Sequence, residues 1–421
     1  MSLSPRDTHI FQLLLVFILI TIAFYYLFLE NRYDVHDVYR ATVTGKKQSF
    51  IEDFLSSDID GSFDGSPLAD LCNTRTWVPG LIFKCEPPRG GVSNVRNIML
   101  NCVRYAIEAG ATGFIVPEIM VHRPKLASVN DLHAQRVVPF TYLFDQAHFT
   151  TTLGAACPKM HIYDHQNDLW DMPSTAIPVH IPRAQLTSLY HTQAETVMLS
   201  PANWTTAFND LLNTSYPRAF STSKPVLVSL ESPLLQWPLS YDQPAFVATF
   251  GRILRFNEDL RRLAATVVYA MSAKYQLGIN PSLPGIQDGR FYGAHLRSAI
   301  DAVKASWTPY ETQAKNYISH ATDSNLRLMY AASDSPKDLV MFIDEAGNNS
   351  FPIEVTTKDL LLLEKGFKRD VVEMASLTLE QQSAIDYEVL LRASLIGGTR
   401  ELGCGLVLKF KGDWPRYEGV E

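Results

Sequence analysis

The chain has 421 residues, more than one hydrophobic core usually contains, so we expect two domains. Its 46% of hydrophobic and 19% of charged residues exclude a mainly disordered, collagen-like or coiled-coil architecture. The formal net charge of −7 disfavours general nucleic-acid binding, because neutralising phosphates requires a basic surface. Five cysteines are too few for a disulfide scaffold, and the odd number leaves at least one thiol unpaired within the chain.

Residues 10–29 form an uncharged, mostly apolar run of twenty residues. A helix of that length is about 30 Å long, which matches the thickness of a bilayer core. The run has no polar face, and no small-residue cleavage site follows it. The sequence therefore predicts a retained transmembrane signal-anchor after a cytosolic tail of residues 1–9, with a cleaved signal peptide as the alternative.

The orientation of this anchor is not decided by charge. Basic residues are more frequent just after the run than before it, so the positive-inside rule does not favour a cytosolic N-terminus. Three N-glycosylation sequons, at Asn203, Asn213 and Asn348, exceed chance expectation only slightly and are weak evidence for a luminal body. The orientation therefore depends on the family resemblance described below.

Residues 30–75 are charged and rich in Ser and Asp, and we interpret them as a solvated stem. After them, strands and helices alternate. An apolar strand at 81–83, a Pro- and Gly-containing loop, an amphipathic helix over 95–107 and a strand at 113–117 form a β–α–β unit. Such a unit predicts a parallel α/β sheet.

A polar, proline-containing middle region precedes a long helix with an apolar face, expected over 246–271. The segment 278–285 contains Gly and Pro and is interpreted as a domain boundary. Beyond it we expect further strands and helices, at 291–296, 308–321, 326–332, 351–355 and 378–393. The prediction is two α/β domains with a cleft between them, residues 76–284 with the connecting helix and residues 285–421.

A first candidate binding loop contains Gly90 and Gly91 between the first strand and its helix. Glycines let a ligand approach the backbone closely, and the free N–H groups at a helix start favour an anion. Arg89 and Arg96 add positive charge, and Ser93 or the neighbouring Asn94 is expected to cap the helix. An ordinary turn is the alternative, and the third glycine of a Rossmann fingerprint is absent.

A second candidate site lies on the strand at 291–296, where Gly293, His295 and Arg297 alternate and therefore share a face. The planar fork of arginine fits the oxygens of a diphosphate. The alternative is a surface strand with an ion pair between Arg297 and Asp301. A third candidate is Asp386, which could accept both donors of a guanine edge, or could be an exposed helix charge.

Together these segments resemble the GDP-fucose protein O-fucosyltransferase family over about residues 77–405, as a divergent, fungal-like member. The resemblance is carried by a glycine-glycine-x-asparagine-type loop, a histidine-x-arginine strand, and an aspartate and a serine before a final strand. These residues are Gly90, Gly91, Asn94, His295, Arg297, Asp386 and Ser394. The family's glutamine after the loop asparagine is Val95 here, and its serine-serine-phenylalanine stretch after Gly397 is replaced.

The resemblance implies a membrane-anchored glycosyltransferase that moves fucose from GDP-fucose to a protein or glycan hydroxyl with inversion. No metal or other cofactor is expected, and GDP-fucose is the donor substrate. The two domains would be Rossmann-like and adopt a GT-B arrangement, with the acceptor side in residues 76–284 and the GDP-sugar side in residues 285–421. The chain would be a single-pass type II protein of the Golgi or ER, with its catalytic domain in the lumen and no nucleic-acid partner.

The same resemblance implies roles for individual residues. Arg297 would hold the β-phosphate as it becomes the leaving group, and Asn94 would be the second catalytic residue. His295 and Asn94 would contact the diphosphate or the fucose, Asp386 the guanine, and Ser394 would complete the nucleotide site with the two loop glycines. The alternatives are a nucleotide-sugar-binding membrane protein without catalysis and a GT-B enzyme that uses another nucleotide sugar.

Other enzyme classes are excluded by specific residues. The glycines near the C-terminus are not followed by the Lys-Ser/Thr of a P-loop, and no Cys/His cluster has zinc spacing. Cys85 and Cys102 are interpreted as buried thiols or a structural disulfide rather than a redox site.

Overall fold

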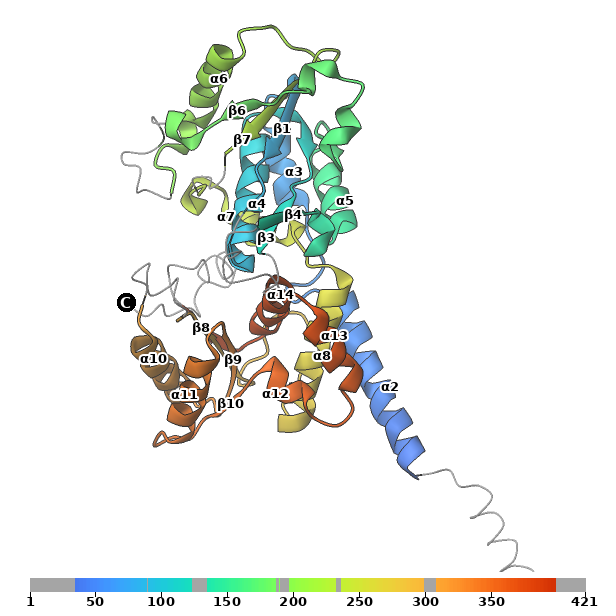
Figure 1. The fold of residues 1–421 in the computed structure, drawn as a ribbon, viewed down its shortest axis with the longest axis vertical. Coiled ribbons are helices and arrows are strands. Elements are labelled where there is room, and N and C mark those ends of the chain that lie inside the picture. Colours follow the sequence, from blue (N-terminus) through green and yellow to red (C-terminus); the bar gives the residue numbers. More distant parts are fainter. Residues whose placement is uncertain are drawn as a thin grey trace, which may run out of the picture. The chain divides into compact units, whose positions relative to one another are not determined.

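The computed structural model describes residues 35–88, 90–122, 135–186, 189, 197–231, 236–298 and 308–398 (Figure 1). The predicted cytosolic tail and anchor, residues 1–9 and 10–29, lie outside these ranges, as do Arg89, Asp301 and Cys404. Among the described residues, no helix has both the length and the apolar character needed to span a bilayer.

The chain forms two compact units, Met1–Glu52 and Asp53–Glu421. Helix α2 (Val35–Ser56) begins in the smaller unit, and the larger unit contains α3 (Ser66–Asn73). In the larger unit Phe54, Leu68 and Cys72 are buried, and Cys72 forms a disulfide with Cys157. The prediction of a solvated stem is therefore wrong at Phe54, Leu68 and Cys72, which belong to a core, and Cys72 is covalently linked to it; the other residues of 53–75 are half-buried or exposed.

The first sheet has the order β5-β2-β1-β7-β6 among the described residues, and all its pairings are parallel. Its strands are β1 (Val78–Cys85), β2 (Ala111–Ile115), β5 (His161–Tyr163), β6 (Val179–Ile181) and β7 (Val226–Leu230). The predicted β–α–β unit is confirmed: α4 (Val92–Glu108) connects β1 to β2, and a Cys85–Cys102 disulfide joins β1 to α4. The predicted cap is wrong, since Gly91 is the N-cap of α4 and no side chain caps it.

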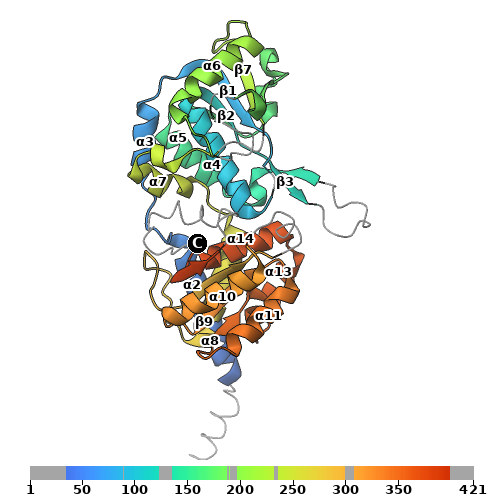
Figure 2. The ribbon, with the colours of Figure 1, turned by 90° about the vertical axis from the view of Figure 1, so that its left-hand side faces the viewer.

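Smaller elements complete this part of the chain. The antiparallel strands β3 (Ile119–His122) and β4 (Gln135–Val138) extend away from the first sheet (Figure 2). The α-helices are α5 (Gln146–Ala156), α6 (Trp204–Ser215) and α7 (Pro244–Phe250). Short 3-10 helices lie at Phe140–Tyr142, Gln166–Leu169, Pro173–Thr175, Arg183–Gln185, Pro201–Asn203, Leu239–Tyr241 and Gly251–Ile253.

The single long helix expected over 246–271 is interrupted. Helix α7 ends at Phe250, a 3-10 turn follows, and α8 (Glu258–Tyr275) begins only after Asn257, whose side chain accepts the N–H of Leu260. Between the two helices, Phe256 forms a β-bridge and stacks its ring on Phe144 at 5.3 Å. The helical pattern is interrupted because this tertiary contact and the local cap compete with a continuous helix.

The second sheet has the order β10-β9-β8-β11 among the described residues, again with parallel pairings. Its strands are β8 (Tyr292–Leu296), β9 (Leu328–Ser333), β10 (Glu354–Thr356) and β11 (Leu395–Gly397). Its helices are α10 (Tyr310–Asp323), α11 (Pro336–Gly347), α12 (Lys358–Leu362), α13 (Lys368–Ser376) and α14 (Leu379–Leu390). The predicted capping box of Thr378 and Gln381 opens α14. Each predicted domain contains one of the two parallel sheets, and the domain boundaries themselves stay a prediction.

The two faces of β8 meet different helices (Figure 1). Tyr292, Ala294 and Leu296 belong to the core cluster that also contains residues of α10 and α11. On the other face lies Gly293, where an added Cβ would come within 2.9 Å of Leu390 Cδ2 and of a further side chain after α14. The glycine therefore permits the close packing of this segment on β8, and the predicted alternation is confirmed for Tyr292, Gly293, Ala294 and Leu296.

Candidate functional site

The carboxyl edge of the second sheet brings Arg297 and Asp334 together. They directly follow β8 and β9, whose last residues are paired in register, and their side chains form an ion pair. The Gln313 side chain accepts the Arg297 N–H at 3.0 Å and donates to the Arg297 carbonyl at 2.8 Å. The backbone of Arg297 is thus fixed, while its side chain keeps 21% of its surface exposed.

His295 lies on β8, two residues before Arg297, and is partly exposed. Burial lowers the pKa of its imidazole to about 4, and the positive charge of Arg297 acts in the same direction. The imidazole is therefore neutral at pH 7 and carries one N–H donor. At this end of β8, Arg297 rather than His295 provides the positive charge for an anionic ligand.

Asp386 lies on α14 and is 9% exposed, which excludes the alternative of an exposed helix charge. One carboxylate oxygen accepts from the Tyr330 hydroxyl at 2.6 Å, and the other from Lys358 Nζ at 2.7 Å. Burial raises the pKa of Asp386, while the positive charge of Lys358 opposes this rise. Burial and the charge of Asp386 also raise the pKa of Tyr330, so its hydroxyl stays protonated and donates.

The guanine contact of Asp386 stays a prediction. It is compatible with the two hydrogen bonds described above, because each carboxylate oxygen has a second lone pair that can accept a further donor. The sequence did not single out Lys358 as a partner. A signal was available, because Lys358 and Asp334 both follow closely after a strand of a parallel sheet. The carboxyl ends of such strands are where ligands bind in open α/β folds.

Ser394 is not brought to this edge. It precedes β11, and the register pairs Leu395 with Tyr292, so Ser394 lies at the amino ends of the two strands. Its hydroxyl accepts the N–H of Arg290 at 2.9 Å and donates to the carbonyl of Gln287 at 2.9 Å. The structure therefore places Ser394 at the opposite edge of the sheet from Arg297 and Asp334.

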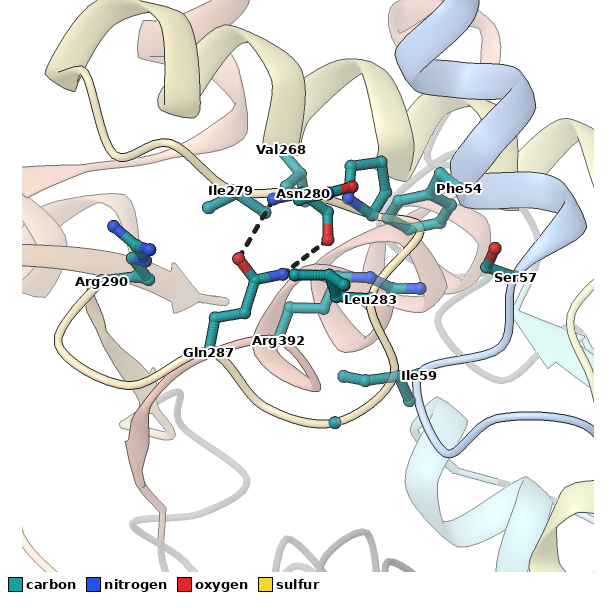
Figure 3. A pocket seen from close by; sticks show the side chains of 12 residues that line it. Phe54, Ser57, Ile59, Val268, Ile279, Asn280, Leu283, Gln287, Arg290 and Arg392 are labelled. Atoms are coloured by element: carbon teal, nitrogen blue, oxygen red, sulfur yellow. Dashed lines mark hydrogen bonds between the residues drawn. The ribbon is translucent and has the colours of Figure 1, made fainter.

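A small cavity adjoins this amino-edge loop (Figure 3). The Asn280 N–H donates to Gln287 Oε1 at 3.1 Å, and Gln287 Nε2 donates back to the Asn280 carbonyl at 2.6 Å. The cavity has a volume of about 20 Å³, which has room for roughly one water molecule. A nucleotide cannot bind there.

The glycine loop lies at the carboxyl edge of the first sheet, between β1 and α4. Gly90 has a φ of +111°, and a Cβ added there would lie 2.9 Å from Asn94 Nδ2. Gly91, the N-cap of α4, has open space around it. The Asn94 side chain therefore covers the loop at Gly90, and a ligand could approach the backbone at Gly91.

Helices α4 and α14 connect the glycine loop of the first sheet with the residues around Asp386 at the second sheet. The Arg96 guanidinium lies 5.8 Å above the ring of Tyr387, which directly follows Asp386. The same guanidinium donates to the Gly251 carbonyl. The N-terminal part of α4, through Arg96, thus packs close to the part of α14 that carries Asp386. Glycine loop, arginine and buried carboxylate together suit a ligand with phosphates and a hydrogen-bonding base.

Within the ranges that the structure describes, no group of three or more His, Cys, Asp or Glu side chains could hold a metal ion.

The family model for GDP-fucose protein O-fucosyltransferases matches residues 81–399, which include every residue of the predicted site. The chain belongs to this family. It is therefore a fucosyltransferase, which is a kind of glycosyltransferase, and the resemblance inferred from the sequence is confirmed.

Solved structures give weaker similarities. The crystal structure of POFUT1 in complex with GDP has a TM-score of 0.45 and 11% identity, covering 81% of this chain and 98% of that chain. A structure of POFUT1 in complex with GDP-fucose has a TM-score of 0.45 and 12% identity over the same shares. These TM-scores and identities are too low to add to the evidence from the family match. No curated relative matches the sequence.

Proposed function

We propose that this fucosyltransferase takes fucose from GDP-fucose and transfers it to a hydroxyl of a protein or glycan. The observation that carries the proposal is the family match, which covers Arg297 at the carboxyl edge of the second sheet. As the glycosidic bond breaks, negative charge accumulates on GDP, and a cation fixed at the β-phosphate lowers the barrier. In this proposal Arg297 takes that role, so the reaction needs no metal ion.

The remaining residues take their roles around this phosphate site in a GT-B arrangement. Asn94 and the N-terminal turn of α4 contact the diphosphate or the fucose from the first sheet. His295 donates its single N–H, and Asp386 accepts from the guanine edge. The acceptor oxygen attacks the sugar carbon from the face opposite the phosphate, which inverts the configuration there.

A nucleotide panel tests the proposed donor. The chain should be stabilised against thermal unfolding by GDP and GDP-fucose but not by UDP, ADP or their sugars. A ligand at 100 times its Kd should add about 2.7 kcal/mol. Turnover of GDP-fucose then separates an enzyme from a binding protein without catalysis. Stabilisation by another nucleotide sugar instead would contradict the proposed donor.

We further propose that the chain is a type II membrane protein of the Golgi or ER, anchored by residues 10–29, with its catalytic part in the lumen. Two disulfides support an oxidising compartment, since such bonds are rare in the cytosol. The three sequon asparagines support it as well, because Asn203, Asn213 and Asn348 are all exposed.

Glycosidase treatment tests this location. In a eukaryotic host, the chain should carry N-linked glycans, so peptide-N-glycosidase should increase its gel mobility. Each Asn→Gln change at a sequon should remove one step of the shift, and the triple variant should show none. A chain that carries no glycan and is extracted from membranes by alkaline carbonate would contradict both the lumenal location and the anchor.

A further inference from the structure

A polar cavity of about 400 Å³ lies at the carboxyl edge of the first sheet. The ends of β1 and β2 and the segment after β5 line it, and its polar side chains are Lys84, Glu118, His165, Gln166 and Asn167. Lys84 Nζ donates to Gln166 Oε1 at 2.8 Å, which fixes one wall. Cavities of this size accommodate small ligands, and a lining of charged and amide groups suits a hydroxyl-bearing one.

Four carboxylates follow strands of this sheet, namely Glu86, Glu118, Asp164 and Glu231. Glu86 lies 3.6 Å from an imidazole nitrogen. Asp164 accepts from a glutamine side chain at 2.6 Å, and Glu231 accepts from a backbone N–H at 3.0 Å. Glu118 is exposed and, within the described part of the chain, forms no hydrogen bond or ion pair. It is therefore the carboxylate of this set that is available to a ligand.

The glycine loop adjoins this carboxylate. The N–H of Met120, two residues after Glu118, donates to the carbonyl of Pro88 at 3.1 Å. Pro88 in turn lies two residues before Gly90. Glu118 and the loop assigned to the donor are thus held next to each other by a backbone hydrogen bond, and the cavity opens between the same strands.

We propose that this cavity receives the acceptor and that Glu118 is the general base of the transfer. The assignment rests on the proposed function. The acceptor oxygen forms a bond to the anomeric carbon of fucose while its proton passes to the Glu118 carboxylate. The bond from that carbon to the β-phosphate oxygen breaks, and GDP leaves with the electron pair beside Arg297. A general base must lie within reach of the proton that it takes, and its removal costs about 10²–10⁴-fold in rate.

Hydrolysis of GDP-fucose tests the assignment without a known acceptor, because water then takes the place of the acceptor hydroxyl. In the full chain, Glu118→Gln should lower the hydrolysis rate about 10²–10⁴-fold. GDP affinity should be unchanged, since the amide has the same shape and Glu118 is not assigned to the donor. The matched control is Glu311→Gln. Glu311 is another exposed glutamate, located on α10, and this variant should hydrolyse GDP-fucose at the wild-type rate.

Azide separates a base from a residue that only supports the structure. Azide is already an anion and needs no proton acceptor, so it should restore turnover of Glu118→Gln and yield fucosyl azide with GDP. A Glu118→Gln variant with wild-type hydrolysis, or one that azide does not accelerate, overturns the role of Glu118 alone. A wild-type chain that binds GDP-fucose but never hydrolyses it overturns it too. A wild-type chain that fails to bind GDP-fucose overturns the proposed function itself.

Discussion

Arg297→Lys should lower kcat for fucosyl transfer by at least about 10²–10³-fold, the usual cost of removing one oriented donor to a developing oxyanion. Arginine contacts two oxygens with a rigid planar fork, whereas lysine presents a single mobile ammonium. GDP affinity should fall less, because a positive charge remains near the phosphates. Steady-state kinetics with GDP-fucose, together with direct GDP titration, measure the two effects separately.

The structure adds a constraint on this variant. The Arg297 side chain is partly exposed and pairs with Asp334, and lysine keeps the charge beside that carboxylate. The free energy of unfolding should therefore change by no more than about 0.5 kcal/mol. Arg218→Lys, at an exposed position outside the site, is the matched control and should leave turnover unchanged. Near-normal turnover of Arg297→Lys, or its unfolding, would refute the role given to this residue.

Local sequence patterns predicted part of the regular structure, while elements such as α5 and, in the polar middle region, α6, β6 and β7 were not predicted. Period-3.6 and period-2 patterns predicted the first β–α–β unit, and the residues at Thr378 and Gln381 predicted the start of α14. The failures arise where distant contacts decide. The acidic residues of 53–75 suggested a solvated segment, but the segment contains buried positions. One of them, Cys72, forms a disulfide with Cys157, which is 85 residues away. The bridge at Phe256 interrupted a helix whose pattern is continuous in the sequence.

The candidate site shows the same division. His295 lies within β8 near its carboxyl end, and Arg297 directly follows the strand, as the sequence pattern indicated. The sequence singled out Asp386 as a candidate. Its hydrogen-bond partners lie 28 and 56 positions away, so the neighbouring residues in the sequence could not predict that it is buried. Ser394 was assigned to the site by resemblance alone, although its position before β11 puts it at the amino edge of the parallel sheet. Glu118 carries no motif, and only the geometry of the cavity distinguishes it.

Asp386→Asn should have two separable effects. Lys358 would lose its counter-charge while its side chain is only 13% exposed, and breaking such a buried pair costs about 3–5 kcal/mol of unfolding free energy. GDP affinity should also fall, since an amide cannot accept from both guanine donors as a carboxylate does. Urea unfolding measures the first effect. Titration with GDP, UDP and ADP measures the second, and only GDP should weaken.

A second substitution distinguishes these effects. Lys358→Met, added to Asp386→Asn, removes the uncompensated charge and should recover most of the lost stability, because an apolar side chain of similar length replaces the buried ion. The loss of GDP affinity should persist in this double variant, since the guanine acceptor is still missing. Asp359→Asn, an exposed neighbour on α12, should change neither property appreciably. If GDP affinity returns together with stability, Asp386 acts on the nucleotide only through the fold, and the base must be recognised by other groups at this edge of the sheet.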